Sequence, residues 1–220
     1  MRVAGIDDAG RGSVIGPLVI AGILIEEQDL PRLIEIGVKD SKLLSPDRRA
    51  QLEQEIRILA LQLHIVKLAP AEIDQVVENG KKLHKLNRLE AHTMARVIET
   101  LKPNVAYVDA SDVLPDRFKQ HIEENVTFKV KIISEHKADA KYPVVSAASI
   151  IAKVERDKAV QILTQKYGEI GAGYPSDPKT IRFLEKWITK YGSYPDFVRK
   201  SWKTAKMLKR EAKSKQTRIT

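Results

Sequence analysis

Five short apolar segments constrain the fold of this chain more than any other feature. The first two, Arg2 to Asp8 and Pro17 to Ile25, are rich in Val, Ile and Leu and flank a glycine-rich turn, which predicts a hairpin of two strands. Three further segments, residues 61–68, 105–108 and 127–133, are apolar or alternate in polarity and predict additional strands. A sheet is therefore the centre of the predicted fold.

Helical patterns lie between and after these strands. Ser45-Pro46 and Ser176-Asp177-Pro178 each offer an N-cap followed by proline at the first helical position. The predicted helices cover residues 46–60, 83–101, 143–167 and 178–191, and a last one runs from about residue 195. Because a helix that joins two strands implies a parallel crossover, we predict an α/β fold.

The composition is typical of a globular chain. Its 220 residues are 43% hydrophobic and 30% charged, and the absence of cysteine excludes disulfides, thiolate metal sites and cysteine nucleophiles. The longest uncharged stretch, Gly12 to Ile25, is shorter than the roughly 20 apolar residues of a membrane span. Charges at Arg2 and Asp7 also differ from the pattern of a signal peptide. We expect a cytoplasmic protein that does not enter the membrane.

Positive charge is concentrated at the end of the chain. The formal net charge is +9, and from Arg199 onward nine Lys and Arg residues face the single acid Glu211, so +8 lies in this tail. Clustered bases gain free energy by releasing the counterions that condense on phosphates. We therefore expect a nucleic-acid partner, with residues 195–220 forming a basic helical extension that binds it and packs on the domain of residues 1–194.

Aspartates follow three of the predicted strands. Asp7 and Asp8 end the first strand, Asp109 ends the fourth, and Asp139 lies shortly after the fifth. The carboxyl ends of parallel strands meet at one edge of a sheet, so these carboxylates can converge and bind Mg²⁺ or Mn²⁺, which prefer hard oxygen ligands. Two such ions would suit phosphodiester hydrolysis. The alternative is that each Asp caps backbone amides in a turn.

The turn after the first strand contains three glycines, Gly10, Gly12 and Gly16. It differs from the dinucleotide-binding fingerprint because its third glycine comes one residue late and a strand, not a helix, follows. Glycine in such a turn lets the backbone approach a sugar closely.

Asp7-Asp8-Ala9-Gly10-Arg11-Gly12 resembles the Asp-Glu-Ala-Gly-Arg-Gly signature of type 2 ribonucleases H (ribonuclease HII), especially the archaeal form. Further segments resemble family blocks in the same order: residues 38–42, 107–109, 136–139, 144–153, 171–178 and 202–204. The resemblance covers the chain to about residue 205. It implies a ribonuclease H-like mixed five-stranded sheet flanked by helices. It also implies an endonuclease that cuts on the 5′ side of a ribonucleotide in RNA/DNA hybrids or in DNA with embedded ribonucleotides, leaving a 5′-phosphate and a 3′-hydroxyl.

The resemblance also assigns roles to residues. Asp7, Asp8, Asp109 and Asp139 would hold the two Mg²⁺ or Mn²⁺ ions and carry the catalysis. Gly10, Arg11 and Gly12 would read the ribose 2′-hydroxyl, and Tyr174 would contact the same sugar. Ser41 and Lys42 would hold phosphate. We expect the enzyme to act as a monomer.

The chain departs from the family pattern at three positions. Asp8 stands where the family has glutamate, Leu43 replaces a lysine, and Ala172 replaces a serine. The shorter side chain of Asp8 leaves two alternatives open, a catalytically weakened protein that binds hybrids and another nuclease on the same fold. The last residues, Gln216-Thr217-Arg218-Ile219, resemble a sliding-clamp peptide only weakly, and we expect no clamp binding.

Overall fold

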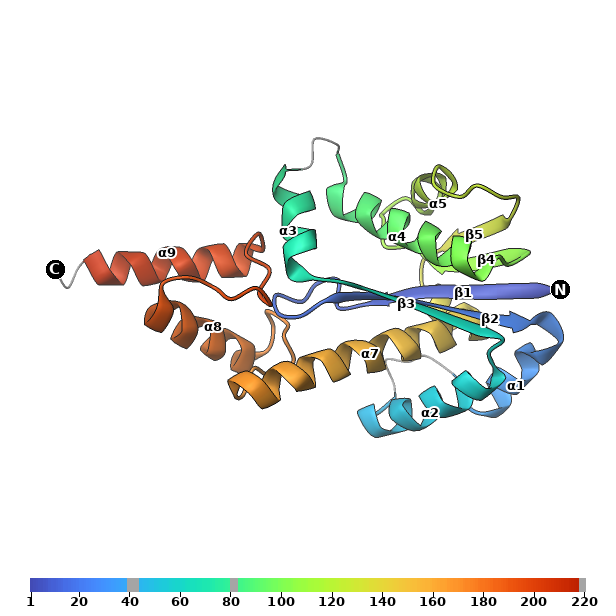
Figure 1. Ribbon diagram of the computed structural model, residues 1–220, viewed down its shortest axis with the longest axis horizontal. Coiled ribbons are helices and arrows are strands. Elements are labelled where there is room, and N and C mark those ends of the chain that lie inside the picture. Colours follow the sequence, from blue (N-terminus) through green and yellow to red (C-terminus); the bar gives the residue numbers. More distant parts are fainter. Residues whose placement is uncertain (39–43, 80–82, 218–220) are drawn as a thin grey trace. The chain divides into compact units, whose positions relative to one another are not determined.

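The structure, a computed structural model, describes residues 1–38, 44–79 and 83–217, with the side chains described as far as Ser214. It divides into two compact units, shown in Figure 1. Unit 1 comprises Met1–Ala9, Val19–Lys67 and Leu83–Glu155, and unit 2 comprises Gly10–Leu18, Leu68–Lys82 and Arg156–Thr220. No helix among the described residues is long and apolar enough to cross a membrane.

Unit 1 is built on a mixed sheet, which within the described residues has five strands in the order β3-β2-β1-β4-β5. β1 runs antiparallel to β2 and parallel to β4, and β4 runs parallel to β5. This confirms the predicted sheet. The strands are β1 (Arg2–Ala9), β2 (Leu18–Glu26), β3 (Gln62–Leu68), β4 (Val105–Asp109) and β5 (Lys131–Glu135).

One face of the sheet packs against α1 (Leu30–Glu35), α2 (Pro46–Leu59) and the first part of α7 (Pro143–Tyr167). A short 3₁₀ turn, η1 (Glu27–Asp29), precedes α1. Gly5 on β1 allows the closest approach of α7, because a Cβ atom there would lie 2.2 Å from the carbonyl oxygen of Val144. The start of α7 is buried, as its small apolar residues predict.

The other face packs against α4 (Lys85–Leu101) and α5 (Pro115–Glu123), and Figure 1 shows these two helices on the opposite side of the sheet from α1, α2 and α7. Successive side chains of a strand point to opposite faces. Val3 therefore belongs to the first core, whereas Ala4 and Ile6 belong to the second. The short helix α6 (Ala138–Lys141) lies between β5 and α7 in the chain.

Unit 2 contains α3 (Pro70–Asn79), the end of α7, α8 (Pro178–Tyr191) and α9 (Lys203–Thr217). Its core joins α8 and α9 to Val14 and Ile15, which follow the glycine turn. Trp187 packs among aromatic rings in this core, 5.7 Å from Tyr167 and 5.8 Å from Phe197 between ring centroids. Trp187 is therefore a packing residue of unit 2.

Some boundaries of the predicted helices and strands agree with the structure, and others differ from it. Helix α7 covers the predicted residues, and Ser45 and Asp177 cap α2 and α8 through their side chains. The fifth strand begins at Lys131 instead of residue 127, because Thr127 donates hydrogen bonds from its amide and its hydroxyl to Glu99. The prediction of helix from residue 195 was wrong, since α9 begins at Lys203.

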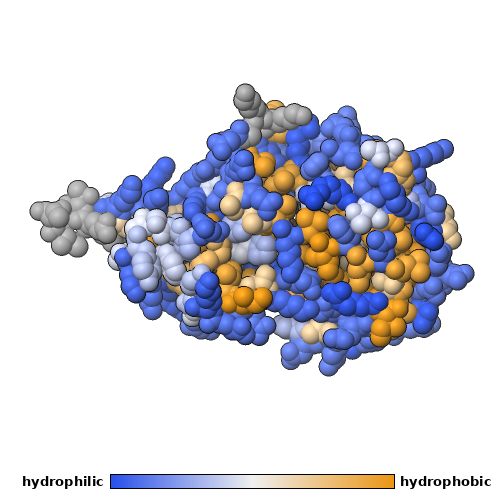
Figure 2. All heavy atoms as spheres, viewed as in Figure 1, coloured by the Kyte–Doolittle hydropathy of each residue, from blue (hydrophilic) through white to orange (hydrophobic). Residues whose placement is uncertain are grey.

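The segment before α9 forms turns and one bridge instead of a helix, because it pairs with another part of unit 2. Val198 forms an antiparallel bridge with Ile15, and the amide of Arg199 donates to the carbonyl of Val14 at 2.9 Å. Helices α1, α3 and α5 were not predicted, because their short apolar patterns were too weak to separate from loops. Hydrophilic side chains cover much of the face shown in Figure 2, with smaller apolar areas between them.

Candidate active site

The first two candidate residues lie at the carboxyl ends of neighbouring parallel strands in unit 1. The register pairs Ile6 of β1 with Val108 of β4, and the next residue on each strand is an aspartate, Asp7 or Asp109. Asp7 is buried, with 5% of its surface exposed. The sheet therefore brings together two acids that are about a hundred residues apart in the sequence.

The surroundings of Asp7 disfavour its negative charge. Burial raises its pKa well above the usual range, and the negative charges of Asp8 and Asp109 raise this pKa further. A hydrogen bond from Ser149 on α7 and one from the Asp8 amide, at 2.7 Å, offset part of the increase in pKa. Asp8 and Asp109 are thus close enough to Asp7 to repel its negative charge.

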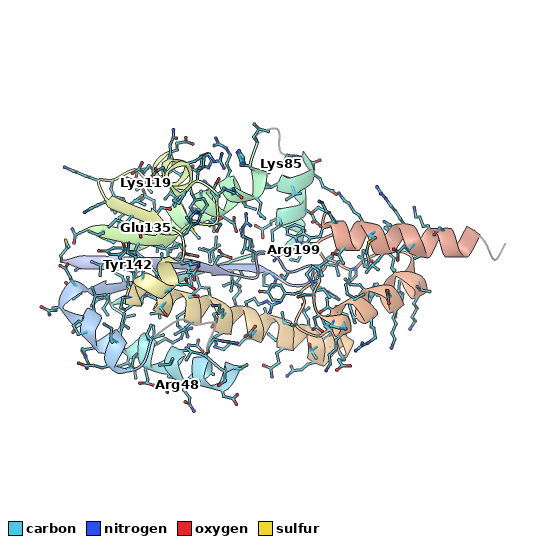
Figure 3. The ribbon with its side chains drawn as sticks, turned by 180° about the vertical axis from the view of Figure 1, so that it is seen from behind. Arg48, Lys85, Lys119, Glu135, Tyr142 and Arg199 are labelled. Atoms are coloured by element: carbon cyan, nitrogen blue, oxygen red, sulfur yellow. The ribbon has the colours of Figure 1, made fainter. Side chains whose placement is uncertain are left out.

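Asp139 is held near Asp109 by the backbone. The amide of Ala138 donates to Oδ1 of Asp109 at 2.7 Å, and Asp139 is the next residue, with 3% exposure. The hydroxyl of Tyr142 donates to Glu135 at 3.0 Å, and both residues are labelled in Figure 3. These two bonds fix the segment between β5 and α7, so all four predicted acids belong to the same strand-end region of unit 1.

The four acids supply the hard oxygen ligands that a divalent cation prefers, but their side chains are not arranged around a common point. Among the described residues, no group of three or more His, Cys, Asp or Glu side chains is arranged to hold a metal ion. Two of the carboxylates accept hydrogen bonds from the protein. The Ser111 hydroxyl donates to Oδ1 of Asp8 at 3.3 Å, and the amide of Ala138 donates to Oδ1 of Asp109. The repulsion that raises the pKa of Asp7 is the kind that a cation bound between the carboxylates removes.

The glycine turn belongs to unit 2. Gly10 has a φ of +86°, and a Cβ atom there would lie 2.8 Å from the carbonyl oxygen of Pro17, so only glycine fits. The fully buried Arg199 holds the turn by donating to the carbonyls of Gly10 and Arg11, both at 2.7 Å. Arg199 also donates to Gly16, at 3.2 Å from Nη2.

Tyr174 lies on a second loop of unit 2, and Arg156 connects this loop to the glycine turn. The Arg156 guanidinium lies over the Tyr174 ring, 4.5 Å from its centroid, and donates a hydrogen bond to the carbonyl of Ala172. Gly173 accepts hydrogen bonds from the amides of Val14 and Ile15 at 2.8 and 3.1 Å. Gly10 and Tyr174, both predicted to contact the sugar, thus lie on loops that are tied together.

Four supporting residues were missed by the sequence analysis or misread. Ser111 and Arg156 gave no signal, and Ser149 lies in the family-like segment 144–153 but was given no role, because each acts through tertiary contacts. Arg199 was counted among the bases available to phosphate, which was wrong, because its side chain is buried in unit 2 and hydrogen-bonded to the glycine turn (Figure 3). Ser41, Lys42 and Leu43 lie outside the described residues.

Comparison with known proteins decides the family. The ribonuclease HII family model matches residues 4–205. This chain belongs to the ribonuclease HII family. Ribonuclease HII of Pyrococcus furiosus is 45% identical over 222 residues, covering 100% of this chain and 96% of the relative. The crystal structure of ribonuclease H2 from Pyrococcus horikoshii OT3 has a TM-score of 0.89 and 45% identity, covering 97% of this chain and 99% of that one.

Membership of the ribonuclease HII family makes the chain an endonuclease of the ribonuclease H class, and it does not favour the alternatives of a binding protein or another nuclease. The crystal structure of Bst-RNase HIII in complex with Mn²⁺ has a TM-score of 0.82 at 19% identity, covering 97% of this chain and 71% of that one. That likeness shows the ribonuclease H fold alone.

Proposed function

We propose that this ribonuclease HII hydrolyses the phosphodiester on the 5′ side of a ribonucleotide, in RNA/DNA hybrids or in DNA with embedded ribonucleotides. The products would be a 5′-phosphate and a 3′-hydroxyl. The observation that supports this most directly is the position of Asp7, whose pKa is raised first by burial and then by the negative charges of Asp8 and Asp109. Such a concentration of negative charge is unfavourable for the fold and suits a site that works with cations.

The four acids, Asp7, Asp8, Asp109 and Asp139, would hold Mg²⁺ or Mn²⁺, because their oxygens are the hard ligands that these ions prefer. Two bound ions supply charge neutralisation at the phosphate and a more acidic attacking water. Ser149 would keep Asp7 oriented through its hydrogen bond. Ser111 and Ala138 would do the same for Asp8 and Asp109, and side-chain rotation would complete the site.

The glycine turn would select the ribonucleotide. Gly10, Arg11 and Gly12 would contact the 2′-hydroxyl through backbone and side-chain groups, because the two glycines let the backbone approach a sugar closely. Tyr174 would pack on the same sugar, and Arg156 would orient the Tyr174 ring through its stacking contact. Ser41 and Lys42 would bind a phosphate.

We further propose that residues 1–194 form the catalytic domain and that residues 195–220 form a basic extension for substrate binding. The three lysines of the extension at positions 203, 206 and 209 support this, since all three are exposed on helix α9. We propose that the enzyme acts as a monomer in the cytoplasm.

Asp109→Asn tests the proposal. The substitution keeps the size of the side chain and removes one charge from the acid group, so we expect cleavage of a DNA duplex with one ribonucleotide to fall by more than about a hundredfold. Duplex binding should survive, because Asp109 carries no charge that attracts phosphate. Cleavage is measured on a denaturing gel, with Mg²⁺ or Mn²⁺, and binding by fluorescence anisotropy without divalent ions.

Asp116→Asn is the matched control, because Asp116 is an exposed acid in the first turn of α5. It should cleave like the unchanged protein. An all-DNA duplex of the same sequence should stay intact. The proposal fails if the unchanged protein leaves the ribonucleotide duplex intact with both metals, or if it cuts the all-DNA duplex equally well.

A further inference from the structure

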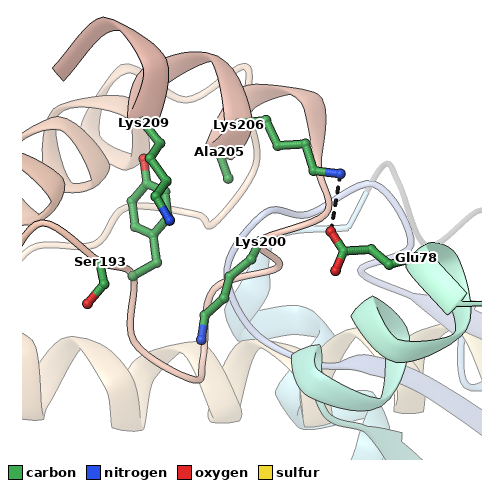
Figure 4. A pocket seen from close by; sticks show the side chains of 7 residues that line it. Glu78, Ser193, Lys200, Ala205, Lys206 and Lys209 are labelled. Carbon is green, nitrogen blue, oxygen red and sulfur yellow. Dashed lines mark ion pairs between the residues drawn. The ribbon is translucent and has the colours of Figure 1, made fainter. Parts of the chain in front are cut away.

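A pocket of about 410 Å³ lies in unit 2, where it includes Lys206 and Lys209 of the basic extension but none of the residues proposed to hold the metal ions or the ribose. It is lined by side chains from α3, from α9 and from the segment between α8 and α9 (Figure 4). Three of these are lysines, Lys200, Lys206 and Lys209, and one is an acid, Glu78. The lining therefore has a surplus of positive charge.

The ion pairs around the pocket do not cancel this surplus. Lys206 pairs with Glu78 at 3.2 Å, and both side chains are about half exposed. Lys200 pairs at 3.5 Å with Asp196, whose side chain is fully exposed, and such surface pairs are weak. Lys209 forms no ion pair with any residue in the described part of the chain. A lysine that is free to turn can donate to a bound anion.

Tyr194 supplies the second observation. It lines the pocket and is 6% exposed, and its hydroxyl is buried with no hydrogen-bond partner among the described residues. A buried hydroxyl without a partner destabilises the fold. A ligand oxygen that accepts its hydrogen bond would remove this destabilisation. Burial and the charge of Glu185 raise the pKa of Tyr194 to about 12, so the hydroxyl keeps its proton and stays a donor.

We propose that this pocket binds a phosphate group, with Tyr194 and Lys209 as hydrogen-bond donors and Lys200 as a further positive charge. Lysine and tyrosine donors that line one cavity suit the recognition of a phosphate oxyanion. The volume exceeds the roughly 30 Å³ of a water molecule many times, so a phosphate fits with its sugar or its waters. Two sources of phosphate have this chemistry, a nucleic-acid backbone and free phosphate in solution. Binding of a backbone phosphate rests on the proposed function.

Tyr194→Phe and Lys209→Gln test the pocket in the full-length protein, in EDTA so that the substrate is bound and not cut. Without phosphate, Tyr194→Phe should raise the thermal midpoint, because it removes the buried hydroxyl. With inorganic phosphate, the midpoint of the unchanged protein should rise, and that increase should shrink in both variants. The affinity for a DNA duplex should fall about tenfold in Tyr194→Phe. In Lys209→Gln, the slope of the logarithm of duplex affinity against the logarithm of salt concentration should become shallower by about one charge.

Tyr191→Phe and Lys186→Gln are the matched controls, because both residues are exposed on the neighbouring helix α8 and neither lines the pocket. If phosphate response and duplex affinity both fall in the pocket variants, the ligand is a backbone phosphate. If the phosphate response alone falls, the ligand is free phosphate. The pocket proposal is overturned if both variants match their controls in both measurements. Failure of the unchanged protein to cleave a ribonucleotide duplex would reject the proposed function and leave the phosphate result standing.

Discussion

Asp7 occupies a position where a negative charge is energetically unfavourable. It is buried beside two other carboxyls, and yet Ser149 and the Asp8 amide donate to it, so the fold stabilises the ionised side chain only in part. Polar donors that orient a carboxyl without neutralising it are what a cation site requires. Arg156 and Arg199 act in the same manner on unit 2, where they fix loops and not a ligand.

Asp8→Glu should increase activity. The added methylene extends the carboxylate towards the position that the family glutamate occupies, and a shift of about 1 Å in such a site changes the rate by up to about a hundredfold. We expect kcat on a single-ribonucleotide duplex to rise about tenfold with Mg²⁺ and less with Mn²⁺, measured under saturating substrate. Asp116→Glu, on the exposed first turn of α5, should leave kcat unchanged. A lower kcat in Asp8→Glu would show that the site is adapted to aspartate.

Helix α7 depends on a glycine in the strand that it crosses. Gly5→Ala would place a Cβ atom 2.2 Å from the carbonyl oxygen of Val144, where neither backbone can yield easily. We expect a loss of about 3 kcal/mol or more in the free energy of unfolding, measured by urea denaturation. Gly12→Ala is the contrasting variant, since a Cβ atom at Gly12 meets nothing within 4 Å and stability should hardly change. Equal stability of both variants would contradict the close packing of β1 and α7.

Helix α5 should make stability depend on pH. His121 is buried, and its pKa is lowered from 6.5 first by burial and then by the positive charge of Arg88. Because the folded-state pKa lies below the unfolded one, the unfolded chain binds the proton more readily, and stability falls as the pH falls below about 6.5. The thermal midpoint should therefore decrease between about pH 7.5 and 5.5. His121→Gln should flatten this decrease; an unchanged slope would exclude His121 as its source.

Charge is unevenly distributed over the molecule. Of the net +9, +8 lies from Arg199 onward, although the buried Arg199 does not contribute to a binding surface. If the remaining bases bind several phosphates, duplex affinity should fall by about a hundredfold or more between about 50 and 200 mM salt. A titration by anisotropy in EDTA measures this, and an all-DNA duplex should give the same slope. An affinity that does not depend on salt would exclude phosphate binding by the tail.

The pattern of strands and helices was predictable because local rules govern it. Apolar runs located β1, β2 and β4, alternating polarity located β3 and β5, and cap residues located the starts of α2 and α8. Local patterns failed where a distant contact overrode them. Thr127 bonds to Glu99 instead of extending β5, and Val198 pairs with Ile15 instead of starting a helix.

The candidate site divides in the same way. The strand-end pattern in the sequence made Asp7, Asp8, Asp109 and Asp139 candidates, and the resemblance to the family signature implied their roles and that of Gly10, all of which stay predictions. Burial and the neighbours of each side chain depend on segments that meet only when the chain folds. For this reason the raised pKa of Asp7, the role of Arg199 inside unit 2 and the buried hydroxyl of Tyr194 emerged only from the folded chain.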